Sequence, residues 1–310
     1  MQFSSPPQGA SILPVPPLAI RRFTATTALG RGRDAQLNAL RDRRGGLRPN
    51  DFGGGEFGGE HRLDCWIGRV DGLEAAALPE GLARWECRNN RLAWLALQQD
   101  GMFDAVAEAR ERLGASRVAI VVGTSTSSIG ASEEAYARLE DGRFPADLQR
   151  PMVHTPHSLG DFLKHATGLR GPCVTVATAC SSSAKVFAQA ARLIQAGLAD
   201  AALVGGVDTL CGSVLYGFNS LGLVSQAKCK PFDATRDGLS LGEAGGFALL
   251  ERVDGAPGLS LRGYGESSDA HHMSAPHPEG LGARLAMADA LARAGVQPAD
   301  IGYLNLHGTA

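Results

Sequence analysis

One cysteine, Cys180, lies where a thiol could act as a nucleophile. Residues 174–178 are apolar and rich in β-branched side chains, which predicts a buried strand. Apolar residues then recur at helical spacing as far as Gly197, which predicts a helix. Cys180 is therefore expected in a sharp turn between strand and helix, at or just before the first helical turn. Turns of this kind point a side chain outward, as in nucleophile elbows.

The start of a helix also favours ionisation of a thiol. Unpaired backbone N–H groups and the positive end of the helix dipole stabilise a thiolate, which is the reactive form of cysteine. The alternative is that Cys180 is a small buried hydrophobic residue, the usual state of a free cysteine. The turn position and the small residues around Cys180 favour the nucleophile.

A histidine near the C-terminal end of the sequence is the second candidate. His307 follows a predicted strand over residues 301–306 and precedes Gly308 and Thr309. Turns after strands often carry catalytic groups in α/β proteins, and histidine is the usual donor or base beside a cysteine nucleophile. The spacing alone does not show that Cys180 and His307 meet, and by itself it favours a lone histidine at a strand end.

Length and composition restrict the class of protein. A chain of 310 residues can bury a large core and form one large domain or two fused domains. The net charge of -2 gives no indication of a nucleic-acid partner, and no apolar run is long enough to cross a bilayer. The cysteines show no CxxC or zinc spacing, so we expect reduced thiols in a cytoplasmic protein. They are Cys65, Cys87, Cys173, Cys180, Cys211 and Cys229.

Strands alternate with helices along the chain, which predicts a layered α/β protein with mostly parallel strands buried on both faces. Residues 1–17 are proline-rich and are expected to form a flexible leader rather than a signal peptide. The predicted strands cover residues 19–27, 118–122, 174–178, 201–207, 245–252, 258–265 and 301–306. The predicted helices cover residues 34–43, 89–109 with a break near 100–101, 133–139, 158–166, 186–197 and 281–294.

A second class of function rests on residues 30–35, which fit the relaxed dinucleotide fingerprint G-x-G-x-x-A. Arg31 and Arg33 add bulk and charge there, and the following sequence enters a glycine-rich loop over residues 53–59. The fingerprint requires a second strand that ends in an acidic residue. A dinucleotide-dependent oxidoreductase is therefore the weaker alternative, and titration with a nicotinamide would test it.

Four motifs follow one another along the chain. They are Gly171-Pro172 to Ala184 around Cys180, Ala199 to Asp208, Lys230 to Gly238 continuing through Gly242-Glu243-Ala244-Gly245-Gly246, and His307-Gly308-Thr309. In this order they resemble the motifs of the β-ketoacyl-acyl-carrier-protein synthases, which are condensing enzymes of the thiolase superfamily. The resemblance is dense over residues 169–252, and the N-terminal half is most similar to discrete bacterial type II synthases of aryl-polyene and related polyketide pathways.

The resemblance implies a thiolase-like layered α-β-α-β-α fold whose second half is truncated. It implies an N-terminal ketosynthase half over residues 18–256 and an incomplete C-terminal half over residues 257–310. It also suggests that Asp233, Arg236 and Glu243 form a buried polar network that holds the active-site loops.

The resemblance also implies the chemistry. Cys180 would take an acyl group from a thioester, and His307 would support decarboxylative Claisen condensation with a malonyl-carrier-protein thioester. Phe218 and Thr309 would contact substrate, and neither a metal nor an organic cofactor would be needed. The implied partners are an acyl carrier protein and a second subunit, in a homodimer or a ketosynthase heterodimer, with no nucleic acid.

The sequence departs from the family at its end. A second catalytic histidine, a lysine and a glycine-rich loop follow the HGT motif in the family, whereas this sequence stops at Ala310. We therefore expect the 310-residue chain to lack condensing activity. Two related alternatives remain open: a non-catalytic, chain-length-factor-like partner subunit, in which the cysteine is normally replaced, and a thiolase, which needs a second reactive cysteine.

Overall fold

The computed structural model describes residues 14–52, 62–253, 255, 258–272 and 275–309. Most of the expected leader over residues 1–17 lies outside the described residues. The chain forms two compact units. One comprises residues 1–19 with 252–305, and the other comprises residues 20–251 with 306–310.

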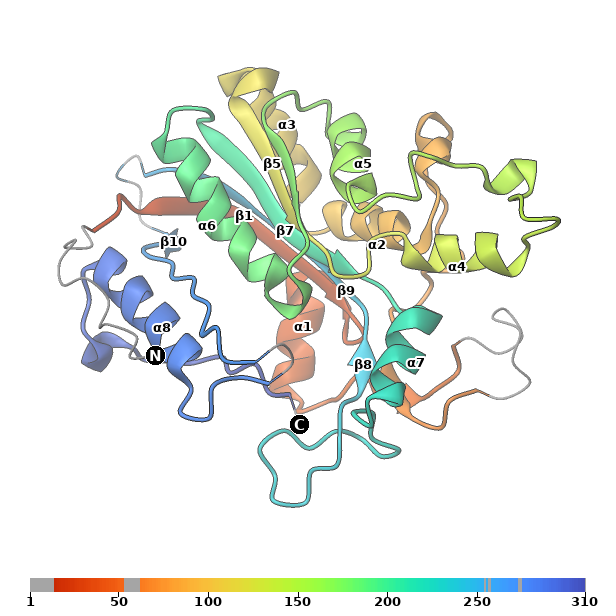
Figure 1. The fold of residues 1–310 in the computed structure, drawn as a ribbon. Coiled ribbons are helices and arrows are strands. Elements are labelled where there is room, and N and C mark those ends of the chain that lie inside the picture. Colours follow the sequence, from red (N-terminus) through yellow and green to blue (C-terminus); the bar gives the residue numbers. More distant parts are fainter. Residues whose placement is uncertain (1–13, 53–61, 254, 256–257, 273–274, 310) are drawn as a thin grey trace. The chain divides into compact units, whose positions relative to one another are not determined.

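A mixed sheet forms the centre of the larger unit (Figure 1), with the strand order β1-β9-β7-β5-β6. β5 runs parallel to both β6 and β7, whereas β9 runs antiparallel to β7. The sheet is therefore mixed, which corrects the expectation of mostly parallel strands. The last residue of β7, Asp208, pairs with the first residue of β9, Ala244, so the two strands run in opposite directions. The strands are β1 (Leu18–Thr27), β5 (Val118–Gly123), β6 (Cys173–Val176), β7 (Ala201–Asp208) and β9 (Ala244–Arg252).

Helices cover both faces of this sheet. Every residue of β5 is buried, and Val118, Ile120 and Val122 pack into one core with residues of α2, α3 and α5. The helix that follows Cys180, α6, contacts β5, β6 and β7 (Figure 1). β6 is only half-buried because it is the last strand in this order, which differs from the buried strand expected there. The helices are α2 (Arg88–Leu97), α3 (Met102–Leu113), α5 (Ser158–Thr167) and α6 (Ser182–Gln195).

The segment with the dinucleotide fingerprint does not form a strand–helix–parallel-strand unit. Gly30 and Arg31 make a short strand that pairs antiparallel with β1, and the next strand after the helix belongs to a separate small sheet of order β3-β4-β8. The remaining elements of this unit are β2 (Gly30–Arg31), α1 (Gly32–Arg41), β3 (Leu47–Pro49), β4 (Trp66–Gly68), α4 (Ile129–Ala137), α7 (Gly212–Ser220) and β8 (Leu241–Gly242).

The smaller unit contains β10 (Ser260–Leu261), which pairs antiparallel with the first residues of β1, and helix α8 (Leu281–Ala294). The strand predicted over residues 258–265 is thus reduced to two residues. The strand predicted over residues 301–306 is wrong: the backbone there makes no ladder in the described part of the chain. Apolar residues at that place matched the pattern of a strand, but a strand forms only where a partner strand pairs with it.

Candidate active site

Cys180 lies in the turn between β6 and α6, as the sequence predicts. A single 3-10 turn, Ala179–Ser181, separates the strand from the helix, and Cys180 is exposed within it. Ala179 has a φ of 50°, a left-handed conformation that costs a non-glycine residue of the order of 1–3 kcal/mol. Such strain persists only where the surroundings fix the backbone. The turn therefore holds the nucleophile candidate in a defined and accessible position.

Two serines hold this strained turn. The backbone N–H of Thr178 donates to Ser182 Oγ at 2.9 Å, and that hydroxyl donates to the carbonyl of Ala179 at 2.7 Å. Ser181 Oγ donates to the carbonyl of Thr178 at 2.9 Å. Because these bonds connect the residues on both sides of Cys180, they fix the backbone of the turn independently of the cysteine side chain.

Two glycines bring the turn into direct contact with the sheet. A Cβ on Gly123, the last residue of β5, would lie 2.5 Å from the carbonyl carbon of Ser182. A Cβ on Gly206, in β7, would lie 2.4 Å from Ser183 Cβ. Both distances are shorter than any real Cβ contact, so only glycine permits this close approach. The first turn of α6 thus rests on β5 and β7 at the edge where these strands end.

A cavity of about 440 Å³ adjoins this turn. Ser183 and Gly206 line it, together with Asp208 at the end of β7 and the buried carboxylate of Glu243. The other lining residues come mainly from the end of β1 and the segment after it, from the start of β3, from the last residue of β4, and from the residues on either side of Glu243. The cavity gives space for a small molecule beside the start of α6.

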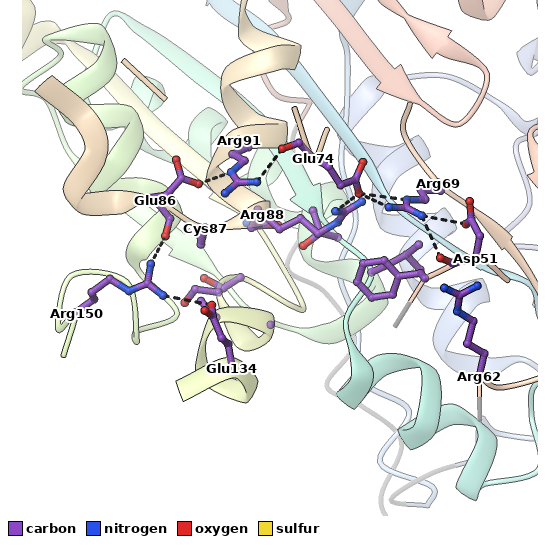
Figure 2. A pocket seen from close by; sticks show the side chains of 18 residues that line it. Asp51, Arg62, Arg69, Glu74, Glu86, Cys87, Arg88, Arg91, Glu134 and Arg150 are labelled. Atoms are coloured by element: carbon purple, nitrogen blue, oxygen red, sulfur yellow. Dashed lines mark hydrogen bonds and ion pairs between the residues drawn. The ribbon is translucent and has the colours of Figure 1, made fainter. Parts of the chain in front are cut away.

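A second cavity of about 480 Å³ lies in the same unit, and five arginines line it (Figure 2). Four carboxylates line it as well, and most of these arginines make ion pairs or hydrogen bonds across it. The arginines are Arg62, Arg69, Arg88, Arg91 and Arg150, and the carboxylates are Asp51, Glu74, Glu86 and Glu134.

Arg88 links the two cavities through Glu243. The fully buried carboxylate of Glu243 accepts hydrogen bonds from Arg88 at 2.7 and 2.8 Å and from the backbone N–H groups of Val70 and Leu210. Each carboxylate oxygen of Glu243 therefore has two donors. The predicted polar network is confirmed for Glu243, but Asp233 and Arg236 are exposed and bond within their own loop.

Arginines of this cavity lower the pKa of Glu74. Burial by itself would raise the pKa of Glu74, but hydrogen bonds from Arg69 and Arg88 outweigh burial and lower this pKa from 4.5 to about 2. Arg69 donates to Glu74 at 2.6 Å, and Arg88 makes a second, shorter contact with the same oxygen. The sequence analysis did not identify this cavity. The only local signal is the spacing of Arg88 and Arg91 on one face of α2.

The other cysteines differ from Cys180 in their surroundings. Of the six, all of which the structure describes, only Cys180 is exposed. Burial raises the pKa of Cys87 and of Cys173 to about 11, and that of Cys211 to about 12. These three thiols are therefore protonated near neutral pH and are poor nucleophiles. Cys180 differs from these three in being exposed, and its role as the reactive cysteine stays a prediction.

The other predicted site residues are not joined to Cys180 by any hydrogen bond within the described residues. His307 and Thr309 are exposed in an irregular segment that groups with the larger unit, where Gly308 approaches Pro231 and Phe232. Phe218 is half-buried on α7. The roles of these residues remain predictions.

Comparison with known protein families identifies the chain. A sequence model described as the beta-ketoacyl synthase N-terminal domain matches residues 89–256, and one described as the beta-ketoacyl synthase C-terminal domain matches residues 259–310. The chain belongs to the beta-ketoacyl synthase family. The turn around Cys180 and part of the lining of the cavity beside it lie in the residues that match the N-terminal domain, and His307 lies in those that match the C-terminal domain.

Curated relatives are 3-oxoacyl-[acyl-carrier-protein] synthases. A synthase 2 of Staphylococcus aureus is 30% identical over 225 residues, which are 68% of this chain and 55% of the relative. A synthase 2 of Rhizobium meliloti is 41% identical over 155 residues, which are 46% of this chain and 37% of the relative. The chain thus spans about half the length, or less, of the curated relatives it matches.

Solved structures of ketosynthases share the fold. A ketosynthase (ApeO) in complex with its chain length factor (ApeC) from Xenorhabdus doucetiae superposes with a TM-score of 0.84 and 37% identity, over 95% of this chain and 72% of that chain. A beta-ketoacyl synthase from Burkholderia phymatum gives a TM-score of 0.80 and 26% identity, over 95% of this chain and 74% of that chain. The fold is therefore the thiolase-like α/β fold of ketosynthases, as the motifs indicated.

None of the helices in the described residues combines the length and the apolar character needed to cross a membrane. No group of three or more His, Cys, Asp or Glu side chains in the same residues is arranged to hold a metal ion.

Proposed function

We propose that the protein is a β-ketoacyl synthase in which Cys180 accepts an acyl group from a thioester. The cysteine sulfur bonds to the acyl carbonyl carbon, the bond to the sulfur of the donor breaks, and the cysteine proton leaves with the donor thiol. The backbone N–H of Cys180 donates to the oxyanion of the tetrahedral intermediate. The observation that carries the proposal is the exposed position of Cys180 in a strained turn at the start of α6.

In the second step, a malonyl thioester loses CO2 and its carbanion attacks the acyl carbon on Cys180. A carbon–carbon bond forms, the bond to the cysteine sulfur breaks, and the acyl chain grows by two carbons. In this proposal His307 donates a hydrogen bond to the malonyl thioester carbonyl and stabilises the enolate that forms as CO2 leaves. The HGT motif in the matched C-terminal domain supports this role.

Phe218 and Thr309 are proposed to contact the substrate. Phe218 presents a half-buried aromatic ring on α7, which suits an acyl chain. Thr309 directly follows the His307-Gly308 pair, and its hydroxyl can bond a polar group of the thioester arm.

The test separates acyl transfer from condensation. The purified protein is incubated with a fatty-acyl thioester, and the covalent adduct is followed by intact-mass spectrometry and located by peptide mapping. We expect a single acyl group on Cys180 and no adduct in Cys180→Ala. Condensation is then measured as β-ketoacyl product from a malonyl-carrier-protein thioester. The 310 residues alone are expected to give no product, and in a longer protein that contains them His307→Ala is expected to reduce product while the adduct still forms.

The outcomes are distinct. Failure of the native protein to form an adduct on Cys180 would overturn the acyltransferase proposal and would fit a non-catalytic partner subunit. An adduct on another cysteine would place the nucleophile elsewhere. Product formation that is unchanged in His307→Ala would remove His307 from the mechanism and leave Cys180 in place.

An acyl carrier protein and a second subunit are the proposed partners. The curated relatives are named for an acyl-carrier-protein substrate, and the neighbour from Xenorhabdus doucetiae is a ketosynthase in complex with its chain length factor. We propose that this protein likewise acts on carrier-bound thioesters as a homodimer or heterodimer. Light scattering of the purified protein distinguishes these from a monomer.

A further inference from the structure

One carboxylate oxygen at the end of β7 accepts four hydrogen bonds from the loop that follows β5. Asp208 Oδ1 accepts from Thr124 Oγ1 at 2.9 Å, from Thr126 Oγ1 at 2.8 Å, and from the backbone N–H groups of Ser125 and Thr126 at 2.7 Å each. Hydrogen bonds to an ionised carboxylate are about twice as strong as those between neutral groups. Asp208 therefore fastens this loop to the end of the neighbouring strand.

The same loop is bonded to the strand that leads into Cys180. The backbone N–H of Thr124 donates to the carbonyl of Val176 at 3.1 Å, and Val176 is the last residue of β6. Only three residues separate Val176 from Cys180. Thr124 thus connects the Asp208 carboxylate to β6, with its hydroxyl on one side and its backbone N–H on the other.

The start of α6 rests on the same two strand ends. Gly123 directly precedes Thr124 and lies against Ser182, while Gly206 lies two residues before Asp208 and lies against Ser183. A shift of the β5 end relative to the β7 end would therefore move both supports of the turn. The Asp208 carboxylate joins the loop after β5 to the end of β7, and it also lines the cavity beside Ser183.

We propose that Asp208 is a positioning residue that fixes the Cys180 turn by holding the loop after β5 onto the end of β7. This inference rests on the proposed role of Cys180 as the acyl acceptor. Asp208 acts through Thr124, Thr126 and the two glycine contacts, and no step of the reaction assigns it a bond to substrate. All four donors meet Oδ1, and a neutral amide oxygen in its place would be a weaker acceptor than the carboxylate.

The test compares Asp208→Asn with Asp200→Asn. Asp200 lies just before β7, at its opposite end, and accepts two hydrogen bonds from Arg117 at 2.8 Å. The rate of acyl transfer to Cys180 at saturating thioester is measured by intact mass for the native protein and both variants, with thermal unfolding as a check of folding. We expect Asp208→Asn to slow transfer by about tenfold or more, since small displacements of reacting groups are costly, and Asp200→Asn to stay within about twofold.

A double-mutant cycle provides the readout that a purely structural role would not move. Thr126→Val removes one hydroxyl donor to Asp208, together with the acceptor of the Thr209 N–H group, and keeps the shape of the side chain. If both residues act through the same loop, the double variant is expected to be slowed no more than about twofold beyond Asp208→Asn alone. The concentration of thioester that gives half the maximal rate is expected to stay unchanged, because the binding groups are not altered.

Each outcome decides the proposal. Equal rates in Asp208→Asn and Asp200→Asn, or effects that multiply in the double variant, would overturn it. If the native protein takes up no acyl group, the proposed function fails separately. The same comparison is then made with alkylation of Cys180 by iodoacetamide, and equal alkylation rates in native protein and Asp208→Asn would overturn the positioning role without reference to acyl transfer.

Discussion

Strands β5 and β7 lie side by side, and their two ends are closed in different ways. At the end where both strands begin, Arg117 and Asp200 form a two-bond ion pair with side chains that are 40% and 38% exposed. At the end where both strands finish, two glycines admit the turn around Cys180, and Asp208 holds the adjoining loop. At the first end an exposed ion pair joins the two residues, and the backbone N–H of Asp200 also donates to the carbonyl of Arg117 at 2.8 Å. At the second end several short-range contacts hold a helix turn and a loop against the strands.

The two ends differ in how precisely their contacts fix the neighbouring atoms. An exposed ion pair contributes between 0 and about 1 kcal/mol and tolerates small movements of long side chains. Glycine contacts with backbone atoms tolerate almost no movement, because the neighbouring atoms cannot rotate away. The finishing end of parallel strands is also the end at which α/β proteins generally bind ligands. The following predictions test this contrast, beginning with the largest expected effect.

Loss of the buried carboxylate near the finishing end should cost the most stability. Glu243→Ala leaves Arg88 without a buried partner and removes the acceptor for the N–H groups of Val70 and Leu210. We expect the free energy of unfolding to fall by about 3–5 kcal/mol, as when one partner of a buried pair is removed. Denaturant unfolding measures this, with Asp200→Asn as the exposed control, for which a loss of less than about 1 kcal/mol is expected. Equal losses of unfolding free energy in Glu243→Ala and Asp200→Asn would contradict the difference between the two ends.

A methyl group under the Cys180 turn should impair chemistry more than folding. In Gly123→Ala the new Cβ would meet backbone atoms of Ser182 and Ser183 at 2.5–2.7 Å. The turn must shift, so we expect a loss of about 1–3 kcal/mol in stability and a decrease of about 100-fold in acyl transfer to Cys180. Gly217→Ala in α7 is the matched control, because a Cβ there meets no atom within 4 Å. Native-like transfer in Gly123→Ala would show that the contact does not position the cysteine.

Alkylation should distinguish Cys173, the first residue of β6, from Cys180, which follows the strand. Cys173 begins the strand, and burial raises the pKa of its thiol from 9.0 to about 11, which reduces its thiolate fraction by about 100-fold at a given pH below 9. Cys180 follows the strand and is exposed. With iodoacetamide at about pH 8 we expect Cys180 to react first, as shown by peptide mapping over time. Faster labelling of Cys173 would contradict the assignment.

Acid should weaken the arginine cavity that adjoins the finishing end. The pKa of Glu74 is about 2 in the folded protein, whereas the ordinary pKa of a glutamate outside the fold is 4.5. The folded state therefore favours the ionised form. The stability that this group contributes is present above pH 4.5 and is lost as the pH falls towards 2. We expect a smaller acid-induced fall in the unfolding temperature for Glu74→Gln than for the native protein. Parallel curves for both proteins would show that Glu74 does not carry this dependence.

The sequence allowed the Cys180 turn to be predicted because every signal for it is local. The apolar run, the small residues and the helical spacing after Cys180 all lie within residues 171–197, and the observed elements β6 and α6 agree with them. The strand expected over residues 301–306 failed for the opposite reason. Its pattern was local, but strand formation depends on a partner that the pattern does not contain.

The arginine cavity and the Asp208 contacts were beyond the reach of sequence reasoning. Asp208 is the last residue of the motif Ala199 to Asp208, but the sequence assigned it no role. Its partners Thr124 and Thr126 lie more than 80 positions away in the sequence, so no local pattern connects them to it. Arg88 and Glu243 are 155 positions apart, and only the order of the strands brings them together. Charged residues occur throughout the sequence, and nothing in their local pattern separates a buried pair from a solvated one.

The sequence by itself determined the family, the α/β class and the cysteine most suited to nucleophilic chemistry. These follow from contiguous motifs, whose residue types are set by local backbone geometry. The tertiary structure decided which residues support that cysteine, because support comes from Gly123, Gly206 and Asp208 on neighbouring strands. Contacts between strands depend on the order and register of the sheet, and these arise only when the whole chain has packed.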